Sequence, residues 1–548
     1  MVRSFLMAFL CTVAAWAQPK PADLVLRGGS IYCLDGPRSW AQTLAVRDGR
    51  IVYVGSEAGV AAYVDPSTRI LELKGHMVLP GFCDAHVHPL LAGLEAMRCH
   101  LNDLPSADKV LAKIRDYAGS HPDLPWIVGS GWGLPLFAQA NPTRQALDSA
   151  VADRPVALES ADGHSMWLNS KALEICGINA KTPDPAGGRI EREPDGTPSG
   201  TLRENAMQLA YRHLPKTSPE ERLQALRWGL DRLARVGITS FHEANAGPDD
   251  LMAYHQLEEN GQLTARVVAA QTITDLAALQ ENRRKYGGKL LRPDAVKLFL
   301  DGVIESRTAA LLDPYVGSSE RGNLLYEPEK LQSLVAQLAA AGFQVHIHAI
   351  GDRAVRTALD SFTKAPGHDL RHTIAHLQLI DQTDLARFRQ LGVVANVQAY
   401  WAQADEYITQ FANPLLGPQR AAQQYPLASL WRSGAVLAGG SDWSVSTPNP
   451  LEAIEVALTR RPVGSNGPAW IAEERMDLPA MLAAYTINGA YLGHCEEETG
   501  SIEVGKAADL VVLERNLFDI PPGEIHGVQV THTILDGRVI YAGQAHTR

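Results

Sequence analysis

Apolar, β-rich runs alternate with helical segments through most of this 548-residue chain, and this alternation constrains the fold more than any other feature. Between the runs, stretches such as 220–236 and 328–341 repeat apolar residues at intervals of three and four, as amphipathic helices do. Such alternation predicts a parallel sheet covered by helices, and the number of repeats favours a closed (β/α)8 barrel. The runs lie at 156–158, 238–241, 295–300, 344–347, 372–376, 393–397 and 436–438.

The two ends of the chain share a hairpin pattern. Near the start, Ala22–Ile31 and Leu44–Val54 are short alternating runs, and Asp48-Gly49 is typical of a tight turn. Near the end, residues 536–543 (DGRVIYAG) closely repeat residues 48–55 (DGRIVYVG). Neither end alone has enough strands for independent stability, so we predict one small β-sandwich domain built from both termini.

These patterns predict a division of the chain into a sandwich and a barrel. The sandwich is expected to take residues 22–78 and 500–545, and the barrel residues 79–499. Within the barrel, the stretch at about 121–215 is rich in Gly, Pro and Trp. We interpret it as an insertion that lays loops across one face.

The start of the chain has the pattern of a secretory signal. An apolar run from Phe5 to Trp16 follows Arg3 and ends in Ala15-Trp16-Ala17, a short core with a small-residue exit. We predict a signal peptide over 1–17, cleavage after Ala17, and a periplasmic or secreted protein. The run is too short to span a bilayer comfortably, so we expect no stable membrane span after its removal.

The balance of charge narrows the class of partner. The chain carries 50 Lys and Arg against 61 Asp and Glu, a formal net charge of -11. A basic stripe that neutralises phosphates is therefore not expected, and we predict a small-molecule substrate and no nucleic acid. Homo-oligomer formation is left open.

Two histidines in the segment Pro80–Pro89 carry the strongest local motif. In a strand, residues two apart point to the same side, so His86 and His88 can place two imidazoles on one metal ion. By itself the motif also fits two structural histidines at the end of a strand.

Further histidines end two later strands. His346 and His348 lie at one strand exit, and His372 and His376 span the next. Barrel enzymes take their catalytic residues from the carboxyl ends of several strands, so this repetition favours a central metal site. We prefer His348 and His376 because they lie nearest the exits, and we expect His346 and His372 to be hydrogen-bonded residues inside the barrel.

Two charged residues complete the candidates. Asp442 follows the run at 436–438, where it can bind a metal ion and carry a proton, although a turn aspartate also fits Gly-Gly-Ser-Asp. Lys297 lies inside the apolar run at 295–300, where an unpaired ammonium is costly. A lysine at a sheet edge is the alternative interpretation.

In their order along the chain, these motifs resemble the amidohydrolase superfamily, in the family 3 branch of N-substituted formamide deformylase-like enzymes. The similar segments are 78–89, 163–165, 167–172, 196–200, 296–302, 306–309, 348–355, 376, 440–443, 449–451, 484–490 and 500–513.

The resemblance implies a barrel with a terminal β-sandwich and a centre of one or two divalent ions, usually Zn²⁺. On that pattern, His86 and His88 bind one ion and His348 and His376 bind the second. Asp442 is implied to be both a ligand and the catalytic proton carrier.

The resemblance also reaches the residues around these ligands. Lys297 matches a position where some members carry a carboxylated lysine that bridges two metal ions. Two positions depart from the pattern: Ala375 stands before the fourth histidine in place of a glutamate, and Gly133 replaces an acidic residue. The implied substrate contacts are Trp132, His164 and Arg307.

Together these features predict a metal-dependent hydrolase that cleaves carbon-nitrogen bonds other than peptide bonds, with amide or formamide substrates. Metal-activated hydroxide would attack the carbonyl while Asp442 carries the proton. A non-hydrolytic isomerase or lyase of the same superfamily is one alternative. A non-catalytic binding protein on the same fold is another, although the presence of every ligand residue argues against it.

Overall fold

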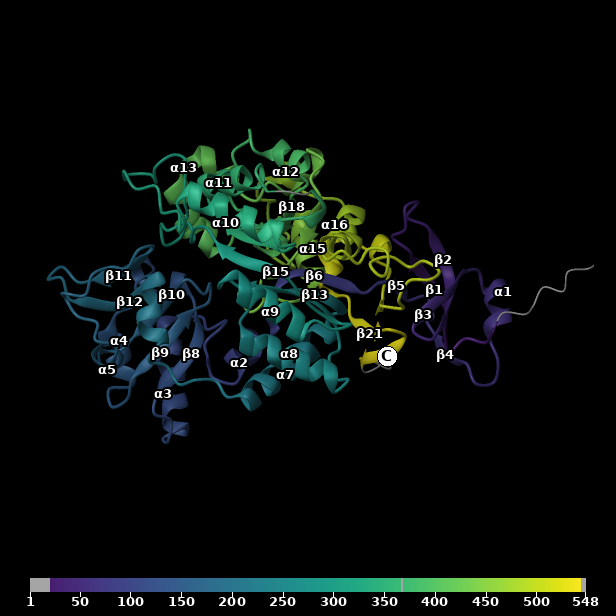
Figure 1. Ribbon diagram of the computed structural model, residues 1–548, viewed down its shortest axis with the longest axis horizontal. Helices are drawn as coiled ribbons and strands as arrows, with labels where there is room; N and C mark the ends of the chain where they lie inside the picture. The colour runs from purple at the N-terminus through teal and green to yellow at the C-terminus, as the bar shows by residue number, and fades with distance from the viewer. Residues whose placement is uncertain (1–19, 366–367, 544–548) are drawn as a thin grey trace, which may run out of the picture.

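The computed structural model describes residues 20–365 and 368–543 (Figure 1), so the predicted signal peptide over 1–17 lies outside the described residues. Within these two ranges, no helix combines the length and hydrophobicity needed to cross a membrane. The five cysteines in the described ranges are all free thiols.

Eight parallel strands form a nearly closed barrel, which confirms the predicted fold class. Each strand pairs in parallel with the next along the chain. In sheet order they are β6 (Phe82–Val87), β13 (Ile238–Ala246), β14 (Arg266–Thr272), β15 (Leu291–Phe299), β16 (Gln344–Ala349), β17 (Thr373–His376), β18 (Val394–Val397) and β19 (Leu437–Gly439).

The first and last barrel strands meet at a seam just beyond β19. The Asp442 backbone N–H donates to the His86 carbonyl oxygen at 2.7 Å, and the His88 N–H donates to the Trp443 carbonyl oxygen at 2.9 Å. One carboxylate oxygen of Asp84 accepts from the backbone N–H groups of His86 and Ser441, at 3.0 Å each. These bonds connect β6 to the loop that carries Asp442.

Helices cover the outside of the barrel (Figure 1). Helix α7 begins at Pro219, after a capping box in which Ser218 and Glu221 satisfy each other's backbone N–H groups. The covering helices are α7 (Pro219–Arg235), α8 (Pro248–Glu259), α9 (Leu276–Tyr286), α10 (Pro328–Ala340), α11 (Asp352–Phe362), α12 (Leu385–Leu391), α13 (Asn413–Ala421), α14 (Leu427–Arg432), α15 (Pro450–Thr459), α16 (Leu478–Ala484) and α17 (Ile487–Leu492).

The two ends of the chain form one mixed eight-stranded sheet. Strand β20 from the C-terminal end lies between β5 and β21, and its Leu510 pairs with Pro80. Apolar residues from both ends, such as Leu26, Leu44 and Ile534, share a core there. The strands are β1 (Leu24–Tyr32), β2 (Trp40–Arg47), β3 (Arg50–Gly55), β4 (Arg69–Glu72), β5 (Met77–Pro80), β20 (Leu510–Leu513), β21 (Val530–Leu535) and β22 (Arg538–Ala542).

A third sheet is inserted between β6 and β13, where we expected loops. Its order is β11-β12-β10-β9-β8-β7, and it has apolar cores of its own. The run at 156–158 belongs to this sheet and not to the barrel. Its strands are short and separated by Gly- and Pro-rich turns, which is why the sequence resembles loops. They are β7 (Cys99–His100), β8 (Ile127–Trp132), β9 (Val156–Ser160), β10 (Ser165–Leu168), β11 (Gly188–Arg192) and β12 (Pro198–Glu204).

The helices of this segment, from α2 to α6, complete the fold. They are α2 (Pro89–Ala96), α3 (Ala107–Ser120), α4 (Arg144–Ala150), α5 (Ser170–Ile175) and α6 (Gln208–Tyr211), and α1 (Glu57–Val60) belongs to the terminal sheet. In Figure 1 the inserted sheet and the terminal sheet lie on opposite sides of the barrel.

An ion-pair cluster links the barrel to the terminal sheet. Arg266, at the start of β14, donates from Nε to an Asp509 carboxylate oxygen at 2.7 Å, and its Nη2 donates to Asp536. The Asp509 side chain is 3% exposed. Loss of the arginine therefore leaves a buried carboxylate without its partner.

We expect Arg266→Ala to lower the free energy of unfolding by about 3 kcal/mol, because breaking a buried pair costs more than the pair contributes. Urea denaturation followed by circular dichroism measures the change. The matched control is Arg284→Ala, since Arg284 pairs with Glu281 at the surface and its loss should cost less than about 1 kcal/mol. Equal losses in the two variants would contradict this account of the interface.

Candidate metal centre

Three predicted ligands meet at the barrel seam. The ligand atoms of His86, His88 and Asp442 all lie within 4.8 Å of one another. One Asp442 carboxylate oxygen is 3.4 Å from His86 Nε2 and 3.3 Å from His88 Nε2. His86 is inside β6 and His88 follows it, whereas Asp442 lies just past β19 in a backbone conformation with φ of 54°. Closure of the barrel at this seam therefore brings the ligands of two distant segments into one cluster.

The other predicted ligands surround this cluster. Lys297 Nζ, from β15, is 3.3 Å from His86 Nε2. His376 Nδ1, at the end of β17, is 3.8 Å from the second Asp442 oxygen. The His348 ring lies 4.5 Å from the His376 ring, centre to centre, but His348 Nε2 faces the Gly302 carbonyl oxygen at 3.3 Å. All six residues therefore meet at one end of the barrel, with His348 turned furthest from Asp442.

Two side chains that the sequence analysis did not select orient the histidines of β6. Glu243, on β13, is 3.2 Å from His88 Nδ1 and also accepts from the Tyr254 hydroxyl at 2.7 Å. His346 Nε2 is 2.9 Å from His86 Nδ1. In each case the contact occupies Nδ1 and leaves Nε2 turned toward Asp442, an arrangement typical of histidines that bind metal ions.

Other candidates have roles in the packing. His372 Nδ1 accepts from the Val345 backbone N–H at 3.0 Å, and its ring stacks on Phe362. Asp301 accepts backbone N–H bonds from Ile350 and Gly351, and so holds the loop that follows His348. His372 is therefore inside the structure, as expected, whereas His346 contacts a candidate ligand directly.

Burial keeps most of the histidines neutral. It lowers the pKa of His86, His348 and His376 well below 6.5, and the neighbouring cationic groups lower it further. Burial also lowers the pKa of His88, but hydrogen bonds with Asp442 and Glu243 outweigh it and raise the pKa to about 9. Neutral imidazoles are the form that binds metal ions.

The residues present fit a divalent metal ion. The donors are imidazole nitrogens and a carboxylate, the set that zinc takes in catalytic sites. In the described part of the chain, His376 Nδ1 is buried without a hydrogen-bond partner. Lys297 forms no ion pair with a carboxylate in that part of the chain, and burial lowers its pKa to about 8. A buried imidazole nitrogen without a partner, beside a lysine whose only polar contact in the described ranges is an imidazole, fits a site that binds a metal ion.

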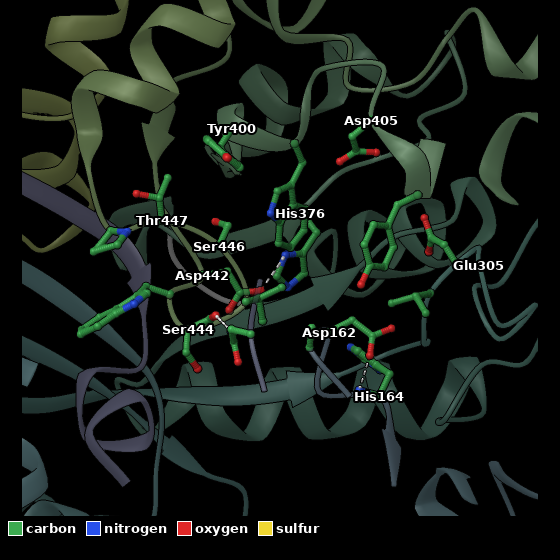
Figure 2. A pocket seen from close by; sticks show the side chains of 18 of the residues that line it. Asp162, His164, Glu305, His376, Tyr400, Asp405, Asp442, Ser444, Ser446 and Thr447 are labelled. Atoms are coloured by element: carbon green, nitrogen blue, oxygen red, sulfur yellow. Dashed lines mark hydrogen bonds and ion pairs between the residues drawn. The ribbon is translucent and has the colours of Figure 1, made fainter. Parts of the chain in front are cut away.

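A cavity of about 780 Å³ opens directly onto this cluster (Figure 2). Its wall includes His348, His376 and Asp442 on the barrel side, and His164 from the inserted sheet. Figure 2 shows His164 and Asp162 across the cavity from Ser446 and Thr447. The volume is within the usual range for a small-molecule site.

The three predicted substrate contacts lie in different surroundings. His164 lines the cavity, and its Nδ1 is 2.9 Å from a Glu204 oxygen. Trp132 is fully buried in the core of the inserted sheet, where its indole N–H donates to the Leu158 carbonyl oxygen at 2.9 Å. Arg307 lines a separate cavity of about 310 Å³. Of the three, this geometry gives only His164 direct access to a substrate beside Asp442.

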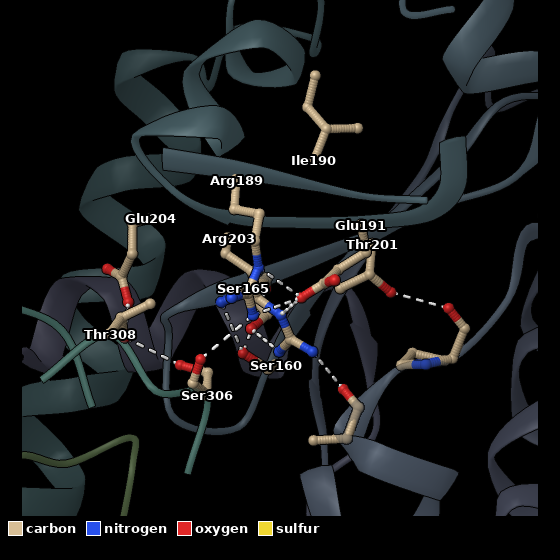
Figure 3. Close-up of polar contacts among 12 residues, drawn as sticks. Ser160, Ser165, Arg189, Ile190, Glu191, Thr201, Arg203, Glu204, Ser306 and Thr308 are labelled. Carbon is tan, nitrogen blue, oxygen red and sulfur yellow. Dashed lines mark hydrogen bonds and ion pairs between the residues drawn. The ribbon is translucent and has the colours of Figure 1, made fainter. Parts of the chain in front are cut away.

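Glu204 connects these surroundings. Besides His164 it accepts from the Thr308 hydroxyl at 2.8 Å, which links the inserted sheet to the loop after β15 (Figure 3). Nearby, the buried Arg203 guanidinium donates to Glu191, Ser165 and the Ala140 carbonyl oxygen. The inserted sheet is thereby held against the cavity by polar contacts.

Comparison with known proteins gives matches along nearly the whole chain. The model of the amidohydrolase family matches residues 69–541. The protein LONG AFTER FAR-RED 3 of Arabidopsis thaliana is 31% identical over 95% of this chain and 92% of its own length. The N-substituted formamide deformylase of Arthrobacter pascens is 27% identical over 95% of this chain and 98% of its own length.

Solved structures agree with these matches. An uncharacterized metal-dependent hydrolase from Pyrococcus horikoshii superimposes with a TM-score of 0.73 at 25% identity, covering 91% of this chain and 99% of the other. The similarity includes the barrel and both additional sheets, because it covers nearly all of each chain.

The contact between Glu243 and His88 gives a prediction about metal affinity. We expect Glu243→Gln to weaken binding of Zn²⁺ by about 10- to 100-fold, since the carboxylate that orients His88 is lost. Competition with a chromophoric chelator measures the dissociation constant. Glu259→Gln, an exposed change at the end of α8, is the control and should leave it unchanged. An equal affinity in the two variants would contradict the role assigned to Glu243.

Proposed function

The chain belongs to the amidohydrolase family, and on that basis we propose that it is a metal-dependent hydrolase of carbon-nitrogen bonds other than peptide bonds. The observation that carries the proposal is the cluster of His86, His88 and Asp442 beside a substrate-sized cavity that Asp442 lines. Amides and N-substituted formamides are the proposed substrates. A relative named for formamide deformylation that matches nearly the whole chain supports this choice.

The proposed centre consists of His86, His88, His348, His376 and Asp442, with Lys297 as a further ligand. It would hold one or two divalent ions, with Zn²⁺ favoured by the imidazole-rich donors. When bound, such an ion supplies Lewis-acid polarisation of the scissile carbonyl and of the attacking water.

We propose that Lys297 is carboxylated on Nζ. The buried amine reacts with carbon dioxide, losing a proton and forming a carbamate, which replaces a buried cation by an anion. The lowered pKa of this lysine favours the neutral amine that such a reaction needs. The surrounding imidazoles, with His86 Nε2 3.3 Å away, suit a negative group bound to metal better than an ammonium.

Asp442 is the proposed proton carrier. Its carboxylate faces the cavity and contacts both histidines of β6. It takes a proton from the attacking water and delivers it to the leaving nitrogen, so that one group acts first as base and then as acid. His164, on the opposite wall, contacts the substrate and is held in place by Glu204.

A first prediction concerns metal content and turnover. Elemental analysis of the purified protein should give about two divalent ions per chain, and His86→Ala and Lys297→Ala should each reduce that number. Asp442→Asn should lower kcat for a formamide by about 100-fold or more, because the proton carrier is lost.

The control is Arg321→Ala. Arg321 does not line the cavity next to the metal cluster but a separate one, so this variant should retain both metal and turnover. One ion that survives the loss of Lys297 would contradict the bridging lysine. A protein that holds metal and converts a substrate without hydrolysis would favour an isomerase or lyase, and absence of metal would favour a binding protein.

A second prediction concerns localisation. We propose a periplasmic or secreted protein with a small-molecule substrate, no nucleic-acid partner and no stable membrane span after signal removal; homo-oligomer formation is left open. Protein recovered from the export compartment should begin at Gln18, as read by N-terminal sequencing. Ala17→Arg blocks the predicted cleavage and Ala22→Ser serves as the control. Recovery of the full-length chain from that compartment would contradict the assignment.

A further inference from the structure

The cavity beside the candidate metal centre has a mainly acidic wall, although its His164 pairs with Glu204, which outweighs burial and raises the His164 pKa to about 9. Apart from Asp442, the acidic residues in its wall are Asp103, Asp162, Glu305, Asp405, Glu406 and Glu452. No lysine or arginine lines it within the described ranges. The opening onto the centre identifies the cavity as a ligand site, and the charge of its wall then determines which ligand it suits.

Three of these carboxylates lie on the side of the cavity away from Ser444 and Thr447 (Figure 2). Asp162 follows β9 of the inserted sheet, Glu305 follows β15, and Asp405 follows β18, so three separate segments contribute one acid each. Tyr407 lines the same cavity, and burial first, and then all three acids, raise the pKa of its hydroxyl.

The charges of this trio are only partly balanced by the protein, through His164, whose pKa is raised, despite burial, by Glu204 and then by Asp162. Burial, with repulsion from Asp162 and Asp405, raises the pKa of Glu305 to about 7, and burial raises that of Asp405 to about 6. Asp162 accepts from its own loop, through the His164 backbone N–H and the Ser160 hydroxyl. In the part of the chain that the structure describes, none of the three forms an ion pair with lysine or arginine. A cation placed there would relieve their repulsion.

Aromatic rings provide the rest of this wall. The Trp401 ring stacks on His376 at 5.5 Å with an angle of 12° between the planes, and Tyr400 and Tyr407 line the same cavity. Ring faces attract organic cations, and most strongly where water is excluded. Aromatic surface and the volume of the cavity suit an organic cation better than a small hydrated metal ion.

We propose that the substrate carries a cationic nitrogen group, an ammonium or a guanidinium, at the end remote from the scissile bond, and that Asp162, Glu305 and Asp405 bind it. This inference rests on the proposed hydrolase function and specifies its substrate class. Substrates with a carboxylate at that end are disfavoured, because Asp162, Glu305 and Asp405 would repel that group.

Three N-formylbenzylamines that differ only in the para substituent test the inference. The substituents are trimethylammoniomethyl, its neutral isostere neopentyl, and carboxymethyl. With the metal-loaded protein we expect kcat/KM to be about 10-fold higher for the cation than for the isostere, and lowest for the anion. Equal values for the cation and the isostere would overturn the inference while leaving the hydrolase function intact.

Two variants locate the effect. Glu305→Gln and Asp405→Asn should each lower kcat/KM for the cationic substrate by about 10-fold, mainly through KM, because each removes one charge that contacts the cation. Turnover of the neutral isostere should stay within about 3-fold, which also shows that the variants are folded. The matched control is Asp116→Asn, on the exposed side of α3, which should change neither value. A loss that is equal for both substrates would overturn the assignment of the cation site.

Binding separates this inference from the proposed function. If the protein cleaves none of the three formamides, the proposed function is wrong as stated. Calorimetry with benzyltrimethylammonium and 3-phenylpropionate still measures whether the cavity binds a cation more tightly than an anion. We expect the wild-type protein to bind the cation in preference to the anion. The doubly substituted Glu305→Gln, Asp405→Asn protein should bind the cation at least 10-fold more weakly. No preference for the cation would overturn the inference on its own.

Discussion

The hydrogen bonds of one buried carboxylate hold the candidate site together. Asp84 accepts from the backbone of β6 and from the loop after β19, and so joins the first barrel strand to the last. Burial raises its pKa to about 7, which measures how unfavourable this position is for a charge. The hydrogen bonds that Asp84 accepts from backbone N–H groups offset part of the cost of burying its charge. Because Asp442 follows this join by one residue, the same bonds place it beside His86 and His88.

The rest of the site is arranged around that join. Side chains behind the histidines, Glu243 and His346, leave Nε2 of His86 and His88 facing Asp442, and Asp442 lines the cavity. The inserted sheet supplies the opposite wall, anchored through Glu204 and Thr308. Reactive groups therefore come from the barrel, whereas part of the surface that a substrate meets comes from the inserted sheet.

Much of this architecture could be predicted from the sequence, because the patterns concerned are local. The helix expected at 220–236 is observed at Pro219–Arg235, and the expected metal ligands lie within or just after the carboxyl-terminal halves of barrel strands. Contacts between distant segments have no such pattern. Glu243 lies inside β13, and only the closed barrel shows that it faces His88.

Aromatic residues and glycines were harder to interpret. Trp132 lies in a Gly-Ser-Gly-Trp segment that resembles a binding loop. Because side chains alternate along β8, its ring instead points into the apolar core of the inserted sheet. The inserted sheet was missed for a similar reason, since strands of two to seven residues between Gly- and Pro-rich turns give little periodicity.

The terminal sheet has a consequence for how the chain folds. Strand β5 leads directly into β6, the strand that carries His86, yet β5 pairs with β20, which is synthesised near the end of the chain. During synthesis the N-terminal strands must wait for that partner while the barrel forms between them. Pairing between segments so distant in sequence raises the contact order and slows folding. The exposed edge of β5 is open to wrong partners during this interval, so assembly of this protein depends on how its earliest strands are protected until its last ones arrive.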